Sequence, residues 1–215
     1  MKLALRLGAV LAATALAVGT GVVATPASAA PAPMKVEIKG GVTSVVTAPG
    51  VAAVLLKGGI LPLPAKGTSF GLAYNKGLAV RYGFPIVDPA SVLVSPDANG
   101  VLRLKGADIA HSGGITFVNA KNGKKVTISN FRVLIDADGA RINAYVSALK
   151  ARADILELVP TSDVVDVNGN RATVSGVKVI LPAEVSGILN SVLHTSTFPA
   201  SSDLFFGTAT VRAII

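Results

Sequence analysis

Two histidines limit the acid–base chemistry that this sequence can perform. His111 and His194 are the only ones in 215 residues, and there is no cysteine. A serine triad would need one of them, yet no G-x-S-x-G sequence surrounds any serine. A zinc site would need more ligands, because neither H-x-x-H nor H-E-x-x-H occurs. His194 follows an expected helix and is interpreted as a polar helix-end residue. We therefore expect a protein that is not an enzyme, with no catalytic residues and no bound metal.

His111 lies in the most distinctive internal segment, between two expected strands and next to the pair Gly113-Gly114. Two interpretations stay open. In the first, the segment is a bulged hairpin whose histidine hydrogen-bonds to its own turn. In the second, His111 points from a strand end into a ligand pocket, with Tyr74 or Tyr82 as partner, because imidazole and phenolate both bind haem iron. Each tyrosine can equally be an amphipathic residue at a strand edge. No cofactor is the first expectation; haem, with His111 and Tyr74 as candidate binding residues, is the alternative.

Three short segments share an Asp-x-Asx-Gly pattern: residues 97–100, 136–139 and 166–169. The pattern resembles the opening of a calcium loop, in which alternate carboxylates or amides bind the ion. Such a loop needs further ligands downstream, and the first two segments do not supply them. Asn-Gly and Asp-Gly pairs also form tight hairpin turns, because they tolerate positive φ. The sequence therefore favours hairpins over calcium sites.

Apolar and polar residues alternate with a period of two through most of the chain after residue 34. β-Branched residues are concentrated in these runs, and turn residues separate them at intervals of about ten. This pattern predicts an all-β fold, mainly an antiparallel β-sandwich or barrel, with two short helices. The expected strands are residues 35–39, 101–105, 125–129, 131–135, 141–146, 155–158, 172–174, 177–180 and 206–211.

Two segments depart from this alternation and predict helices. In residues 49–56, Pro49 suits a first helical turn, and Gly58-Gly59 ends the segment. Residues 182–193 begin with Pro182 in the same way. Both helices are expected to cap or plug the ends of the β-structure. The apolar face expected for the second helix consists of Val185, Ile188, Leu189 and Val192.

The start of the chain has the pattern of an export signal. Lys2 and Arg6 precede an almost unbroken apolar run, and Ala27-Ser28-Ala29 is an A-x-A cleavage site. Later apolar runs are shorter than the roughly 18 residues of a membrane span, so we expect no transmembrane segment in the mature chain. The expected location is secreted or extracellular, with cell-wall association as a further expectation. The expected organisation is a signal peptide over residues 1–29, a flexible leader over 30–34 and a single β-rich domain over 35–215.

The chain is basic. Its net charge of +8 falls to +6 when the two basic residues of the signal are removed. Such a surplus favours anionic partners, such as cell-envelope polymers or lipid headgroups. Lys121, Lys124 and Lys125 form the only tight basic group, so a general role in solubility is the alternative. No RNA-binding aromatic motif or basic helix occurs, and we expect no nucleic-acid partner. The sequence leaves the oligomeric state open.

Four blocks of sequence carry a resemblance to known proteins: residues 83–86, 109–117, 128–136 and 182–190. They resemble small secreted actinobacterial β-rich proteins of an uncharacterised family, and this likeness brings no established activity. More remotely, a Phe/Tyr strand, a histidine–glycine hairpin and the strand ISNFRVLID are similar in order to the HtaA-type haem-binding domain. That resemblance implies an extracellular domain that binds haem through tyrosine and histidine, here Tyr74 and His111 only. The tryptophan-containing opening of that family is missing here.

Two functions from different classes follow as expectations. The first is a secreted, non-catalytic cell-surface β-domain with a structural or interaction role, which binds anionic envelope material through distributed lysines and arginines. It is favoured because it requires no special site, and it predicts release from cell walls by moderate salt. The alternative is an HtaA-like module that carries haem or another flat hydrophobic ligand, which predicts a defined absorption band.

Overall fold

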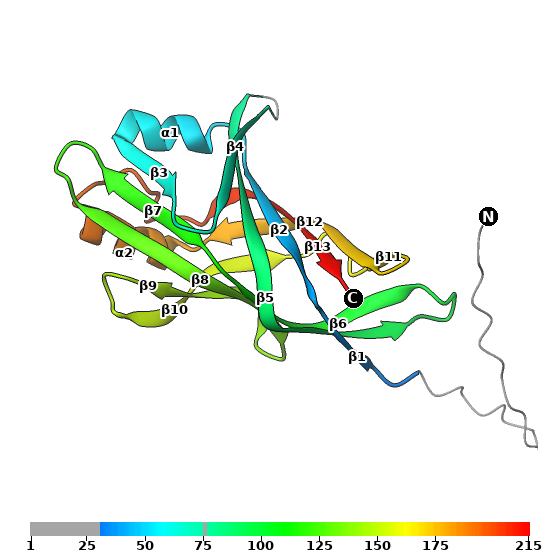
Figure 1. Ribbon diagram of the computed structural model, residues 1–215. Helices are drawn as coiled ribbons and strands as arrows, with labels where there is room; N and C mark the ends of the chain where they lie inside the picture. Colours follow the sequence, from blue (N-terminus) through cyan, green and yellow to red (C-terminus); the bar gives the residue numbers. More distant parts are fainter. Residues whose placement is uncertain (1–30, 75–76) are drawn as a thin grey trace, which may run out of the picture.

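Eight antiparallel strands close into a barrel in the computed structural model, which describes residues 31–74 and 77–215 (Figure 1). The last strand of the wall pairs with the first, so the wall has no free edge. The predicted all-β fold with two short helices is confirmed, and it is a barrel rather than a sandwich. Around the wall the order is β5 (Leu78–Pro96), β2 (Gly40–Thr47), β13 (Leu204–Ile214), β12 (Arg171–Leu181), β10 (Ala151–Val159), β9 (Gly139–Val146), β8 (Lys125–Asp136) and β6 (Leu102–His111), which pairs with β5.

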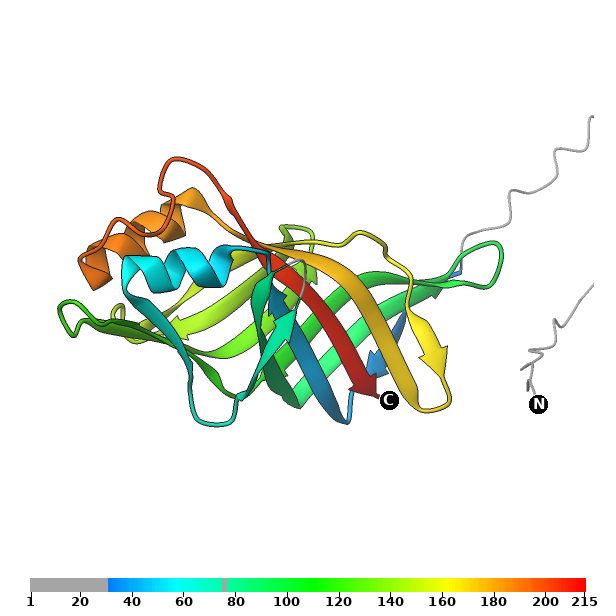
Figure 2. The ribbon, with the colours of Figure 1, turned by 90° about the horizontal axis from the view of Figure 1, so that it is seen from above.

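Further elements extend the wall at its ends. One pair of short strands continues the sheet along β8, and three others pair with β5 or β12. Both helices lie at the same end of the barrel (Figure 2). These additional elements are β1 (Met34–Glu37), α1 (Val51–Gly58), β3 (Ile60–Pro64), β4 (Ser69–Tyr74), β7 (Gly114–Asn119), β11 (Asp166–Asn168) and α2 (Ala183–Leu193).

Strand β8 illustrates how alternation builds the core. Residues 125–129 and 131–135, expected as two strands, form one strand with Asn130 between them at a φ of 52°. The register with β9 shifts directly after Ser129, so an extra residue is inserted there. The bulge keeps the apolar residues on both sides of it pointing inward. Buried along this strand are Val126, Ile128, Phe131 and Val133.

The three Asp-x-Asx-Gly segments lie in hairpin turns, as predicted. Asp136 pairs with Gly139 across the turn between β8 and β9. Asp97 begins the turn between β5 and β6, where its carboxylate accepts hydrogen bonds from two backbone N–H groups of that turn. Asn168 ends β11 and pairs with Arg171 of β12. Within residues 31–74 and 77–215, no three acidic or histidine side chains gather into a metal-binding group.

The two helices end where the sequence predicts. Gly59 terminates α1 in the left-handed region, with a φ of 84°, and His194 terminates α2 with a φ of 50°. The predicted apolar face of α2 is partly wrong, because Ile188 is 37% exposed. The helix is rotated so that a serine lies in the buried face. The buried face of α2 consists of Ser186, Leu189 and Leu193.

The described residues contain no helix with the length and apolar character needed to cross a lipid bilayer.

Strand β5 is 19 residues long, and the sequence pattern does not predict it. Gly83 and the prolines at 85, 89 and 96 interrupt the alternation, and proline is unusual inside a sheet because it cannot donate to the ladder. The pattern also misses β2, β3 and β4, each of which contains glycine or proline. β5 pairs with β1, β2, β4 and β6, so it connects most of the N-terminal half of the fold.

Residues 1–30 lie outside the described residues, so the signal peptide and its cleavage site stay predictions. Met34, which the sequence places at the end of a flexible leader, already belongs to β1 and pairs with Val94 of β5. The hydroxyl of Ser95 also donates a hydrogen bond to the carbonyl of Pro31 (2.9 Å). The start of the described chain therefore lies along β5.

Candidate functional site

His111 lies inside the barrel at the end of β6. Its side chain is 3% exposed, and its Nε2 atom is 2.6 Å from Oγ1 of Thr43 on β2. Both strands pair with β5, where His111 is opposite Ile86 and Thr43 is opposite Phe84. The two polar side chains therefore meet across β5 on the inner face of the wall. Thr43 carries no signal in the sequence, because only barrel closure brings β2 and β6 to the same strand.

No group lies in hydrogen-bonding geometry with the second ring nitrogen of His111 among the described residues, although the carbonyl groups of Ile109 and Phe131 lie close to the ring. Because the contact with Thr43 engages Nε2, the Nδ1 atom is left as a buried donor or acceptor, whichever nitrogen carries the proton. Burial lowers the pKa of His111 from 6.5 to about 4, and the nearby carbonyl groups of Ile109 and Phe131 oppose this shift only in part. An unpaired buried polar atom costs about 1–3 kcal/mol. A guest with a complementary polar group would recover part of that cost.

An internal cavity of about 110 Å³ adjoins His111. All the wall strands contribute to its lining, and every lining residue except Thr43 and His111 is apolar. Apolar cavities of about 150 Å³ stay dry and take up a benzene-sized guest. Pockets for drug-sized ligands measure about 300–1,000 Å³. The cavity is therefore closer in size to a single aromatic ring than to a drug-sized ligand, and Thr43 and His111 supply its only polar groups.

The candidate haem residues His111 and Tyr74 are not brought together. Tyr74 ends β4 with 88% of its surface exposed, and it pairs with Leu78 of β5. His111 pairs with Ile86, so the two positions are separated by roughly 26 Å along an extended strand. They cannot bind one iron atom in this arrangement. The role of each residue as a single haem ligand stays a prediction.

Tyr82, the other tyrosine considered beside His111, is fully buried on β5. Its hydroxyl donates a hydrogen bond to the carbonyl of Pro62 (2.8 Å), and its ring contacts those of Phe70 and Phe84. Burial raises the pKa of the Tyr82 phenol well above its usual value. The side chain is therefore a protonated core residue, and ligation as a phenolate would require its hydrogen bond to break.

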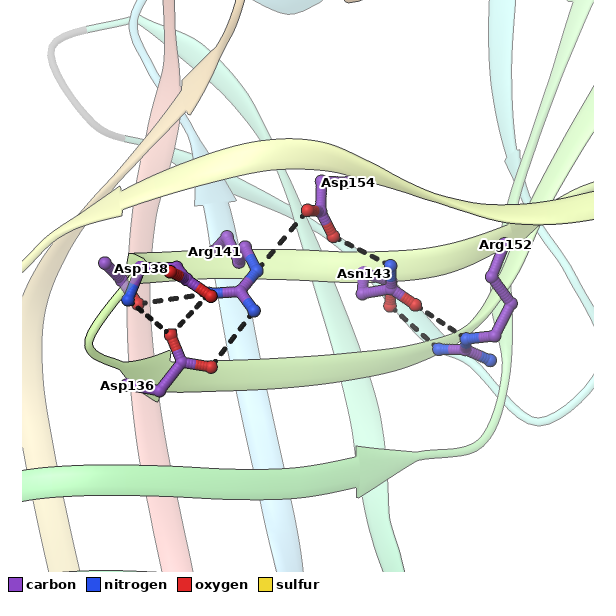
Figure 3. A network of polar contacts seen from close by, with 7 residues as sticks. Asp136, Asp138, Arg141, Asn143, Arg152 and Asp154 are labelled. Carbon is purple, nitrogen blue, oxygen red and sulfur yellow. Dashed lines mark hydrogen bonds and ion pairs between the residues drawn. The ribbon is translucent and has the colours of Figure 1, made fainter.

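The largest polar network on the outer surface joins β8, β9 and β10 (Figure 3). Arg141 contacts Asp136 (2.7 Å) and Asp154 (3.3 Å), and Asn143 donates to Asp154 and accepts from Arg152. The Arg141 guanidinium holds the pKa of Asp136 below its usual range. A general acid needs the opposite shift. This network therefore resembles a set of structural ion pairs rather than a catalytic carboxylate pair.

Four lysines lie on elements that meet at the barrel end that carries the helices. The backbone N–H of Ala120 donates to the carbonyl of Gly59 (2.8 Å), and the Lys121 side chain packs over Gly59. This contact brings the β7–β8 turn beside the last turn of α1. All five ion pairs in the described part of the chain use arginine. Residues 38–87 and 109–135 contain no Asp or Glu. We name this group the lysine cluster; it consists of Lys57, Lys121, Lys124 and Lys125.

Comparison with known proteins finds no matching family model and no matching curated protein. Among solved structures, the chain is similar to the C-terminal domain of HtaA from Corynebacterium glutamicum, with 13% sequence identity and a TM-score of 0.46. The similarity covers 83% of this chain and 98% of that chain. The remote similarity to the HtaA-type domain that the sequence predicts is thereby confirmed. The likeness to small secreted actinobacterial proteins stays a prediction.

Proposed function

We propose that this protein is a secreted, non-catalytic β-domain that binds anionic envelope material through the lysine cluster. The observation that supports this proposal is the position of Lys57 beside the β7–β8 turn, because it adds a fourth positive charge to the three that the sequence places together. Anionic polymers are attracted to such a surface, and the attraction weakens with salt. The hydrogen bond between Ala120 and Gly59 holds the turn and the helix end together, so one polymer segment is expected to contact both.

The test is retention of the purified protein on beads that carry poly(glycerol phosphate). We expect wild-type protein to be retained at about 0.05 M NaCl and released by about 0.5 M NaCl. Replacement of all four cluster lysines by glutamine is expected to abolish most of the retention. A matched control loses the same charge elsewhere, through glutamine at Lys35, Lys39, Lys105 and Lys178. Equal losses in the two variants would refute a defined site and leave only general charge.

The second candidate function is carriage of a flat hydrophobic ligand, with haem as the alternative drawn from the sequence. The supporting observation is the apolar cavity beside the unpaired Nδ1 atom of His111. The cavity is smaller than pockets for drug-sized molecules, so haem would need movement of the lining side chains or a position outside the barrel. Phenol is much closer to the cavity in size and carries one polar group, so it is the smaller probe of the same interior.

Two titrations separate these ligands. Phenol is expected to raise the melting temperature of wild-type protein, and His111→Leu is expected to weaken that effect because it removes the polar partner. Haem is titrated in parallel and followed by absorbance, with His111→Ala and Tyr74→Phe as variants. A saturable Soret shift that either substitution weakens would favour haem. The absence of both effects would refute carriage by this barrel.

A further inference from the structure

The exposed surface of α1 is mostly apolar, with Lys57 as its one charged side chain. Val51, Ala52 and Leu55 are buried on the inner face. The exposed residues of α1 are Ala53, Val54, Leu56 and Lys57; Val54 and Leu56 lie on opposite flanks of the helix and are 57% and 49% exposed. A surface helix usually carries polar residues on its outer side. The burial of the inner face explains why α1 forms, but it leaves the apolar outer face without a structural reason.

The hairpin of β4 and β5 repeats this feature. Phe70, Leu72 and Tyr74 alternate along one face of β4 and are 49%, 72% and 88% exposed, and Leu78 of β5, opposite Tyr74, is 49% exposed. The side chains closer to the barrel on the same face, Val80 and Tyr82, are buried. The exposure of these side chains therefore increases along the two strands with distance from the barrel. Helix α1 lies beside β4 in both views (Figures 1 and 2).

The sequence segment that carries these residues contains basic side chains but no acidic ones. Residues 38–87 include all of α1, β3 and β4 and contain no Asp or Glu. Lys57 ends α1, and Lys121 packs over the following Gly59. Apolar side chains beside lysines match the interface of an anionic bilayer, where the former enter the acyl boundary and the latter remain among the headgroups. A protein partner with an apolar patch alone would not account for the absence of acidic residues.

We propose that α1 and the paired strands β4 and β5, up to Tyr74 and Leu78, dock on an anionic lipid surface, with Val54, Leu56, Leu72 and Tyr74 entering the interface. This inference rests on the proposed function and narrows its partner from anionic envelope material to anionic lipid. The apolar contact makes the docking partly resistant to salt, unlike retention on a polymer by charge alone. Each lysine adjacent to the surface is expected to contribute about a fivefold factor to the affinity.

The experiment measures co-flotation of the purified protein with vesicles. One set contains phosphatidylglycerol and phosphatidylcholine, and the other contains phosphatidylcholine alone. We expect binding to the anionic set only, with a fraction retained at high salt. The double variant Leu56→Ser and Leu72→Ser is expected to lower the affinity for these vesicles at least tenfold, because it removes two apolar side chains from the interface. Both side chains are exposed, so their replacement is expected to leave the fold intact. Its control replaces Leu93 and Val167 by serine; these residues are 42% and 40% exposed at other positions.

Several outcomes would overturn the lipid assignment. Wild-type protein could fail to float with anionic vesicles, or the double variant could bind them as well as the wild type. A dimer in analytical ultracentrifugation that the double variant abolishes would assign the face to self-association instead. The poly(glycerol phosphate) assay separates this inference from the proposed function: the double variant is expected to keep its polymer retention, whereas the cluster variant loses both kinds of binding. If wild-type protein bound the anionic vesicles but was not retained on the polymer beads, only the polymer would be excluded as a partner and the lipid assignment would stand.

Discussion

The buried imidazole of His111 should make the stability of this protein fall between pH 6.5 and pH 4. Its pKa is about 4 in the folded state and 6.5 in the unfolded chain, because burial disfavours the charged ring. In this window the unfolded chain binds a proton that the folded protein does not bind, so lower pH favours unfolding. Stability from this group is fully present above pH 6.5 and is lost as the pH approaches 4. From these two pKa values, the free energy of unfolding should drop by about 2.5 kcal/mol between pH 7.5 and pH 4.5.

The aspartates that pair with arginine act at lower pH than this window. Arginine partners hold the pKa values of Asp97, Asp108, Asp136 and Asp163 below their usual 3.8. Their contribution to stability is present above that pH and is lost only below it. A decline that begins near pH 6.5 therefore cannot come from these carboxylates.

The assay is urea denaturation followed by far-UV circular dichroism, since the chain has no tryptophan. His111→Leu is expected to be less pH-dependent by about 2.5 kcal/mol over this range, whatever its stability at pH 7.5. His194→Gln is the matched control, because His194 is exposed at the end of α2 and should leave the decline unchanged. An equal decline in His111→Leu and wild type would refute the assignment to this residue.

Three further predictions concern stability and use the same denaturation assay. Ile60→Ala should cost about 2–5 kcal/mol, because Ile60 is fully buried between α1 and the sheet, and an unchanged midpoint would contradict this. Gly114→Ala should cost about 1–3 kcal/mol, because the added methyl group would overlap the carbonyl oxygen of Ile128. Asn119→Ala should cost about 1–3 kcal/mol, since Asn119 Nδ2 donates to the carbonyl of Leu193 (2.9 Å) at the end of α2; a loss below 0.5 kcal/mol would argue that water replaces this bond.

The part of the fold that could be predicted from the sequence is the part in which each residue faces one environment. Residues 125–135 alternate cleanly, and β8 follows from that pattern despite the bulge at Asn130. β5 could not be found in this way, because Pro85 and Pro89 interrupt the local signal while pairing with four neighbouring strands maintains the strand. The outward apolar face of α1 also escaped prediction, since a run of apolar residues does not indicate which side is buried.

The candidate sites divide in a similar way. Lys121, Lys124 and Lys125 could be grouped from the sequence because they are neighbours in it. Lys57 joins them only through the contact between Gly59 and Ala120, which depends on the pairing of β3 with β7. The contact of His111 with Thr43 likewise requires closure of the barrel, so no local spacing could reveal it. Tertiary pairing, rather than residue type, determines which polar groups share a site.

Strand β13 completes the wall between β12 and β2, with Ile214 opposite both Arg171 and Gly40. During synthesis, β2 must therefore wait for β13, a segment far downstream in the sequence, before it can pair on that side. Pairing between segments so distant in sequence is slow, and until it occurs the apolar inner face is accessible to other chains. The barrel should thus close only once β13 has been made, and its yield should depend on how well the nascent chain is kept apart from others until then.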